Sequence, residues 1–194
     1  MLTTNSEINR LLSKLGLVWF TCQFFLTQHV PQVAAQGLAE WTILEPISLE
    51  GEYARNPTLA VSSDGRIHAF WSAVSIGQET EPWVLFYASY DEGLWTQPVD
   101  IMFSPDNGYV RYPRAIVDSE DRLHLIWSGP GSGAFEMLYY SWVLATDAWS
   151  VMSWATPVPM AIGTLQSDIR AGPERDLHLV YGSGTDDLGI CHQL

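Results

Sequence analysis

Positive charge is scarce in this sequence. Beyond residue 35 it contains no lysine, and seven arginines face 21 aspartates and glutamates, a formal net charge of −14. Nucleic acids and anionic membrane surfaces attract proteins chiefly through lysine and arginine. The acidic balance therefore argues against both as partners and is typical of a soluble secreted protein.

Cysteine is almost absent as well, with Cys22 and Cys191 as its two occurrences. Cys22 lies in a segment that we expect to be removed, so no intrachain disulfide can form and packing must supply the stability. Lipid attachment at Cys22 is disfavoured, because Phe20 and Thr21 before it do not match the small residues that such sites prefer. No motif indicates a cofactor or a metal, and we expect neither.

Long apolar runs are missing too. The stretch Leu15–Leu26 has about 12 residues, which is short for the ~20 of a membrane-spanning helix. Arg10 and Lys14 precede it, and Val33–Ala35 supplies small residues where a signal peptidase reads the chain. This succession predicts a signal peptide over residues 1–35, cleavage before Gln36, and a secreted protein without a stable membrane span. An uncleaved membrane anchor is the alternative.

What is present is a repeat. A pattern of fifteen residues occurs at 57–71, 113–127 and 167–181. Corresponding positions hold a histidine and, three residues later, a large aromatic residue: His68 and Trp71, His124 and Trp127, His178 and Tyr181. Repeats with a period of about 50 residues are typical of β-propeller blades.

The composition inside one repeat predicts four strands. Short β-rich runs at Thr58–Ser62, Ile67–Ser72 and Trp83–Tyr90 are separated by turn-forming residues, and a fourth run begins at Trp95. The fourth run has a counterpart at Trp154–Val158, and its proline suits an outer edge strand.

We therefore predict an all-β fold of four-stranded antiparallel propeller blades. Two blades are complete (about 57–104 and 113–160), a third is partial (167–194), and an outer strand lies near 41–47. A propeller ring normally has four to eight blades, so the expected ring is incomplete. We favour a fragment of a longer propeller; assembly of several chains into one ring and a small open structure are the alternatives.

The repeated unit resembles the blades of sialidase-like β-propellers with bacterial neuraminidase repeats. Those proteins carry an Asp-box, S-x-D-x-G-x-x-W, between the third and fourth strands. Ser89, Asp91 and Gly93 match it, and Trp95 follows one residue early. The resemblance implies that the aspartate accepts backbone hydrogen bonds in the turn and that the tryptophan packs between strands, on the face opposite the active site. In the second repeat only Thr146-x-x-Trp149 and a stray Asp147 remain, so the motif is degenerate there.

The resemblance also nominates two ligand-binding arginines. Sialidases place an Arg-Ile-Pro segment before an early strand, where the arginine is one of three that bind the substrate carboxylate. Arg55-Asn56-Pro57 and Arg111-Tyr112-Pro113 occupy similar places, and a guanidinium suits a planar carboxylate. Because the feature repeats with the fold, each arginine also has a structural interpretation as an alternative to ligand binding. In that interpretation it is a solvated residue before a proline that sets the entry to a strand.

No catalytic residue is identified. The tyrosine nucleophile, its glutamate and the acid/base aspartate of sialidases have no counterpart that a motif could place. Glu79 and Glu81 lie in a loop on the expected ligand-facing side and could form an acid and base pair, although glutamates in surface loops are usually inert. We interpret the three aligned histidines as structural, because a ring would hold them far apart, and most aromatic residues as packing between blades.

Two functions remain open. The first is a secreted glycan-binding or interaction module without catalysis, whose partner is a glycan or another extracellular protein. The alternative is part of an exo-sialidase or a related glycoside hydrolase.

Overall fold

The computed structural model describes residues 45–78, 82–102, 109–131, 136–162, 166–173, 176–182 and 190–193. The predicted signal peptide, Glu79 and Glu81 lie outside these residues, as does most of the predicted strand near 41–47. Residues 45–47 carry no strand. No helix among the described residues is long and apolar enough to cross a membrane.

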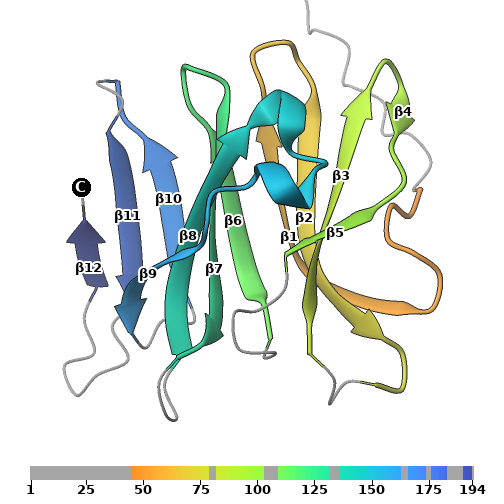
Figure 1. The fold of residues 1–194 in the computed structure, drawn as a ribbon, viewed down its shortest axis with the longest axis horizontal. Helices are drawn as coiled ribbons and strands as arrows, with labels where there is room; N and C mark the ends of the chain where they lie inside the picture. The colour runs from red at the N-terminus through yellow and green to blue at the C-terminus, as the bar shows by residue number, and fades with distance from the viewer. Residues whose placement is uncertain are drawn as a thin grey trace, which may run out of the picture. The chain divides into compact units, whose positions relative to one another are not determined.

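The chain forms three antiparallel sheets that follow one another along the sequence (Figure 1). The first sheet contains β1 (Glu52–Val61), β2 (Ile67–Ser75) and β3 (Val84–Asp91), with the short strands β4 (Leu94–Trp95) and β5 (Val99–Met102) both paired to β3. The predicted all-β class with antiparallel blades is thereby confirmed.

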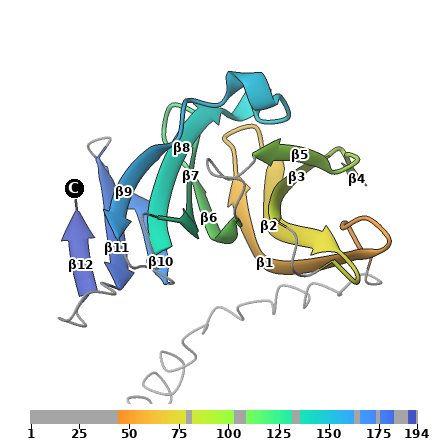
Figure 2. The ribbon, with the colours of Figure 1, turned by 60° about the horizontal axis from the view of Figure 1, so that its bottom comes forward.

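The second and third sheets repeat this order. The second contains β6 (Arg111–Val117), β7 (Arg122–Pro130), β8 (Glu136–Leu144) and β9 (Val158–Ile162), with two short 3-10 turns, η1 (Ala145–Asp147) and η2 (Val151–Ser153), before β9. The third contains β10 (Ser167–Ala171), β11 (Leu177–Gly182) and β12 (Ile190–Gln193). The second sheet lies between the other two (Figure 2), in agreement with the contacts of β6 with both β1 and β10.

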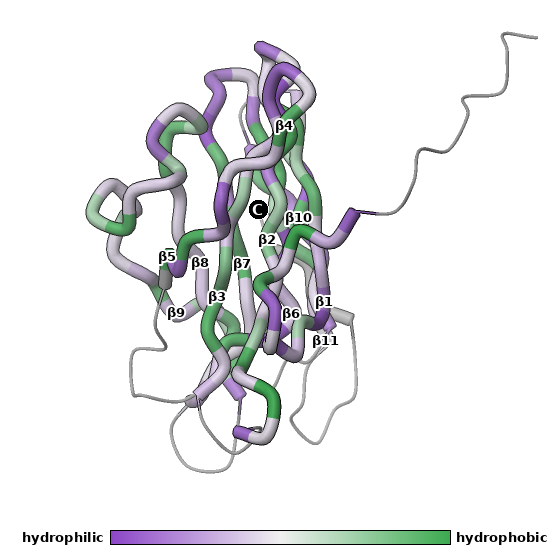
Figure 3. Tube along the Cα trace, turned by 90° about the vertical axis from the view of Figure 1, so that its right-hand side faces the viewer, coloured by the Kyte–Doolittle hydropathy of each residue, from purple (hydrophilic) through white to green (hydrophobic). Residues whose placement is uncertain are grey.

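The core lies between the sheets. Phe70, Leu85 and Tyr87 of the first sheet pack against Leu125 and Trp127 of the second. A separate cluster joins the second sheet to the third through four buried residues, Ile126, Leu138, Ile169 and Leu179. Figure 3 shows hydrophobic residues recurring along the strands, while hydrophilic ones mark several of the turns. Alternation on each strand thus supplies an apolar surface to both neighbouring sheets.

The outer strands begin later than predicted. The sequence indicated strands starting at Trp95 and Trp154, but β5 starts at Val99 and β9 at Val158, each directly after a proline. A proline has no N–H to give to the ladder, so pairing begins beyond it. Trp154 is instead buried, and its indole N–H donates to the Ala148 carbonyl at 3.0 Å.

The Asp-box turn also differs from the expectation. Glu92 (φ 49°) and Gly93 (φ 91°) form a two-residue hairpin between β3 and β4, as positive φ at both positions requires. Asp91 pairs with the Arg66 guanidinium at 2.9 Å and, among the described residues, accepts no backbone N–H of its turn. The turn between β6 and β7 has that arrangement instead: Asp118 accepts from the backbone N–H groups of Glu120 and Arg122 at 2.8 and 2.9 Å.

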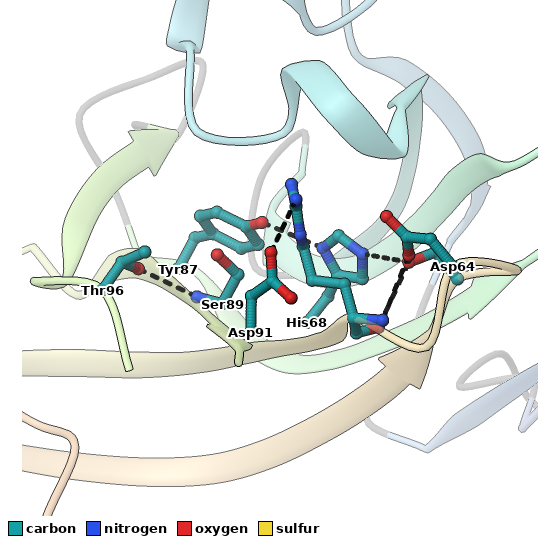
Figure 4. A network of polar contacts seen from close by, with 8 residues as sticks. Asp64, His68, Tyr87, Ser89, Asp91 and Thr96 are labelled. Atoms are coloured by element: carbon teal, nitrogen blue, oxygen red, sulfur yellow. Dashed lines mark hydrogen bonds and ion pairs between the residues drawn. The ribbon is translucent and has the colours of Figure 1, made fainter. Parts of the chain in front are cut away.

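Two of the aligned histidines, His68 and His124, are buried, and Figure 4 shows His68 with its partners. His68 contacts the Tyr87 hydroxyl through Nδ1 at 2.9 Å and the Ser62 hydroxyl through Nε2 at 3.0 Å. His124 contacts Tyr140 and Asp118 in the same way, at 2.9 and 3.0 Å. Each ring joins the turn after the first strand to the third strand of its own sheet.

Candidate functional site

Two strained bulges interrupt the first strands. The pairing register of β1 shifts between Arg55 and Thr58, and that of β6 shifts between Arg111 and Arg114. Asn56 and Tyr112, the residues after the two nominated arginines, have φ angles of 54° and 53°. The backbone of a residue other than glycine rarely adopts this conformation, and for a bulky residue such as tyrosine it is costly. The same backbone strain therefore occurs at equivalent positions of β1 and β6.

Each nominated arginine stacks on aromatic rings. The Arg55 guanidinium lies 4.2 Å from the ring centre of Tyr53 and 5.5 Å from that of Trp83, and it donates a hydrogen bond to the Tyr53 hydroxyl. The Arg111 guanidinium lies 4.3 Å from the ring centre of Tyr109. These contacts fix the planes of both guanidinium groups by cation–π attraction. Arg55 is exposed and Arg111 is half-buried.

The two arginine groups are neighbours. The backbone N–H of Val110, between Tyr109 and Arg111, donates to the Trp83 carbonyl at 3.1 Å. The structure therefore brings Arg55 and Arg111 to the same end of adjacent sheets, and their role in ligand binding stays a prediction. We call this region the arginine–aromatic end; its six residues are Tyr53, Arg55, Trp83, Tyr109, Arg111 and Glu136.

A tyrosine–glutamate pair completes this end. The Tyr109 hydroxyl donates to Oε1 of Glu136 at 3.0 Å, and the other carboxylate oxygen is buried without a partner among the described residues. Burial, and then the hydrogen bond and charge of Glu136, raise the pKa of Tyr109 to about 12, against the opposing charge of Arg111. The phenol therefore stays protonated at neutral pH. Sequence analysis missed this pair because its members lie 27 residues apart and share no motif.

A polar cleft runs along the first strands. Its volume is about 690 Å³, and ten residues line it: Asn56, Thr58, Leu59, Tyr112, Arg114, Ala115, Gln166, Ser167, Asp168 and Arg170. These residues come from β1, β6, β10 and the residue just before β10, so all three sheets contribute. Since Asn56 and Tyr112 are also the strained residues, the bulges join the cleft to the arginine–aromatic end.

Two further arginines face this cleft. Arg170 donates to Oδ1 of Asp168 and to the Ile169 carbonyl, both at 2.8 Å. Arg114 donates to the Pro113 carbonyl at 2.8 Å and has no carboxylate partner among the described residues. Among the described residues the Arg114 guanidinium thus forms no ion pair, and Asp168 lines the same cleft.

Arginine is concentrated on the first strands. Of six described arginines, four lie there, Arg55, Arg111, Arg114 and Arg170, whereas Arg66 and Arg122 pair with acids at the start of the second strands. In a chain this acidic, such a cluster makes a local positive region that attracts anions. The described residues contain no group of three or more histidine, cysteine or acidic side chains placed to hold a metal ion.

Comparison with known proteins supports the fold. No family model matches the sequence, and no curated protein matches it. Among solved structures, a protein of unknown function from Dyadobacter fermentans aligns with a TM-score of 0.57 and 14% identity over 74% of this chain and 51% of its own. Zg3597, a family 117 glycoside hydrolase from the marine bacterium Zobellia galactanivorans, aligns with a TM-score of 0.53 and 12% identity. The alignment covers 79% of this chain and 56% of the hydrolase.

The third structure is the Hadza microbial sialidase Hz136, with a TM-score of 0.57 and 15% identity over 74% of this chain and 33% of the sialidase. At these identities the likeness establishes the fold alone, a propeller-like arrangement of antiparallel sheets. The chain spans about half the length of the first two proteins and a third of the sialidase.

Proposed function

We propose that this protein is a secreted carbohydrate-binding propeller whose ligand is an acidic saccharide. The observation that carries the proposal is the concentration of arginine on the first strands, around a polar cleft, in a chain of strongly negative net charge. The presence of a sialidase and a glycoside hydrolase among the structural neighbours supports a carbohydrate ligand.

The side chains suit such a ligand. Guanidinium groups bind carboxylates with two parallel hydrogen bonds, and Arg114 has no competing carboxylate among the described residues. Amide and hydroxyl groups of Gln166 and Thr58 can bind sugar hydroxyls, and the exposed ring of Tyr53 at the arginine–aromatic end can stack on a sugar face.

The test is a calorimetric titration with oligosaccharides that carry sialic or uronic acid, compared with neutral saccharides of the same length. We expect binding of the acidic series, and a loss of at least about tenfold in affinity for Arg114→Ala and for the double variant Arg55→Ala/Arg111→Ala. Arg66→Ala is the matched control, because its guanidinium pairs with Asp91 away from the cleft. Equal affinity for both series, or equal losses in all variants, would reject the proposal.

A second candidate function is glycoside hydrolysis. The Tyr109–Glu136 hydrogen bond favours it, because a tyrosine beside a carboxylate is one form of an activated nucleophile. Burial and Glu136 raise the pKa of Tyr109 to about 12, so its hydroxyl would need Glu136 as a base before it could act as a nucleophile. The arginines around the cleft make binding the function that we propose first.

A further inference from the structure

The polar cleft brings together equivalent residues of the three repeats. Strand β6 contacts both β1 and β10 and lies between them (Figure 2). Thr58, Arg114 and Asp168 each pair with the residue before the recurring aromatic of the second strand, so they occupy one position of the repeat. All three line the cleft. This position therefore offers a hydroxyl in the first sheet, a cation in the second and an anion in the third.

The third sheet departs from the other two beside this position. In the first two sheets an arginine, Arg55 or Arg111, pairs with the serine that follows the recurring aromatic residue, and a bulge comes next. In the third sheet Gly182 occupies the position of that serine, and its N–H donates to the Gln166 carbonyl at 3.0 Å. Gln166 therefore lies where the other sheets carry an arginine, and it supplies a neutral amide.

The carboxylate of Asp168 has one oxygen free to accept from a ligand. Its Oδ1 accepts from the Arg170 guanidinium at 2.8 Å and from the Ile169 backbone N–H at 3.0 Å. Its Oδ2 accepts from none of the described residues, and the side chain is 50% exposed. An ionised carboxylate only accepts hydrogen bonds, so Oδ2 suits a hydroxyl or an amide N–H and repels a second carboxylate.

Ser167 adds an unsatisfied hydroxyl to the same wall. The residue is buried, yet its Oγ has no hydrogen-bond partner among the described residues. Ser167 lines the cleft and also a smaller cavity of about 270 Å³ that shares Gln166 and Asp168 with it. Buried polar groups in native proteins are nearly always hydrogen-bonded, and a ligand oxygen is a partner that this hydroxyl can take.

We propose that the cleft selects acidic saccharides in which an uncharged ring adjoins each charged one, over saccharides with a carboxylate on every ring. This inference rests on the proposed function and deepens it. Arg114 binds the carboxylate of one ring, while Gln166, Ser167 and Asp168 bind hydroxyl or acetamido groups of the next. A carboxylate on that next ring would face Asp168. Attraction by arginine alone predicts the opposite preference, since each added carboxylate would then strengthen binding.

The test is a calorimetric comparison of two tetrasaccharide probes with the full chain. The first is unsulfated hyaluronan, which carries carboxylates on alternate rings, and the second is oligogalacturonate, which carries one on every ring. We expect the wild-type chain to bind the hyaluronan tetrasaccharide at least about tenfold more tightly, because like charges brought together across an interface are costly.

Replacement of Asp168 by asparagine should shift the two affinities in opposite directions. The galacturonate probe should bind about fivefold more tightly or better, because the change removes the repelling charge and releases Arg170. The hyaluronan probe should bind about two- to fivefold more weakly, because a neutral acceptor replaces a charged one. Asp91→Asn is the matched control and should change neither affinity, since Asp91 also pairs with an arginine, is 53% exposed and lies outside the cleft.

Replacement of Ser167 by alanine separates ligand binding from a structural role. The affinity for the hyaluronan probe should fall about two- to tenfold through loss of one hydrogen bond. The free energy of unfolding should not fall, because the hydroxyl has no partner to lose among the described residues. Ser72→Ala is the matched control, since its hydroxyl is also buried without a partner there and the residue does not line the cleft.

The outcomes distinguish this inference from the proposed function. Equal affinity for the two probes, tighter binding of galacturonate, or the same shifts in Asp91→Asn as in Asp168→Asn would overturn the inference. The proposed function would stand in each case, provided that acidic probes still bind more tightly than neutral ones. Binding of neither probe would overturn both.

Discussion

The three aligned histidines show how one residue type finds different partners at one position of a repeat. His68 contacts the Ser62 hydroxyl, which in turn donates to Asp64 at 2.5 Å. His124 contacts Asp118 directly, because Asp118 stands where Ser62 stands in the first repeat. A satisfied ring nitrogen is needed in each case, since a buried donor or acceptor without a partner is costly.

Replacement of His124 by alanine should destabilise the protein. The change removes the contacts to Tyr140 and Asp118 and leaves both partners without the imidazole, for a loss of about 1 to 3 kcal/mol in the free energy of unfolding. Chemical denaturation measures the loss. His178→Ala is the control and should cost less, because the His178 side chain is 36% exposed. An unchanged stability together with a lost ligand or metal would contradict the structural role.

Stability should also fall in mild acid through His68. Burial, and then the charge of Arg66, lower the pKa of His68 to about 4 from its ordinary value of 6.5, against the opposing charges of Asp64 and Asp121. The unfolded state therefore binds a proton between pH 6.5 and 4 that the folded state does not. The contribution of neutral His68 to the free energy of unfolding is complete above pH 6.5. It is lost as the pH falls, by about 2 to 3 kcal/mol at pH 4.5.

Urea denaturation at pH 7 and at pH 4.5 would measure this loss, with His68→Gln as the comparison. Glutamine keeps a polar group at the position but does not titrate, so the variant should be less stable at pH 7 and lose less between the two pH values. The same loss in both proteins would assign the pH dependence to other groups.

At the scale of elements, turns with the same backbone shape are built from different residues. Gly65 in the β1–β2 turn has a φ of 87°, and Asp121 at the equivalent position of the β6–β7 turn has a φ of 56°. Aspartate tolerates this conformation better than most residues. Its carboxylate also accepts from the Ser63 backbone N–H at 2.8 Å and from the Ser63 hydroxyl, which links the turns of two sheets.

Two substitutions at Asp121 separate these effects. Asp121→Gly keeps the left-handed backbone but removes both hydrogen bonds to Ser63, and should cost about 1 kcal/mol. Asp121→Ala removes the same bonds and adds backbone strain, and should cost about 1 kcal/mol more. The difference in unfolding free energy between the two variants is the measurement. Equal stability of the glycine and alanine variants would show that the backbone strain contributes nothing.

The whole molecule gathers most of its described arginines in one region, although acids accompany some of them: Arg170 pairs with Asp168, and Glu136 lies at the arginine–aromatic end. Acidic side chains are spread over a chain of strongly negative charge, while four arginines gather where the first strands of the three sheets meet. This concentration of arginine favours anion binding at the first strands without making the protein basic. It supports binding, whereas catalysis needs an acid, a nucleophile and a substrate clamp held together at close tolerance.

The purified chain should therefore not hydrolyse sialosides. Sequence analysis identified no catalytic residue, and the arginines named among the described residues belong to three sheets. A fluorogenic sialoside provides the assay, with the double variant Arg55→Ala/Arg111→Ala as the blank. Turnover above that of the double variant, abolished by Tyr109→Phe, would favour the glycoside hydrolase over the binding module.

Export should remove the N-terminal segment. The basic residues, apolar stretch and small residues before Gln36 predict cleavage there. Intact-mass measurement of the protein recovered outside the producing cell should find a chain that begins at Gln36. Recovery of an intact chain from Met1 in the cytoplasm would contradict the prediction.

The sequence by itself determined the sheets. Alternating apolar residues and the fifteen-residue repeat placed the first three strands of each full blade, because side-chain alternation and turn residues act locally. It also nominated Arg55 and Arg111, which the structure brings to the same end of adjacent sheets.

Tertiary structure alone decided the rest. The Tyr109–Glu136 pair, the bulges at Asn56 and Tyr112, and the cleft with Arg114 and Arg170 depend on residues far apart in the sequence. The Ser63–Asp121 link joins residues 58 positions apart, and no local pattern records it. This link forms only when the first and second sheets pack together, since the register between sheets is set by side-chain volume and not by periodicity within a strand.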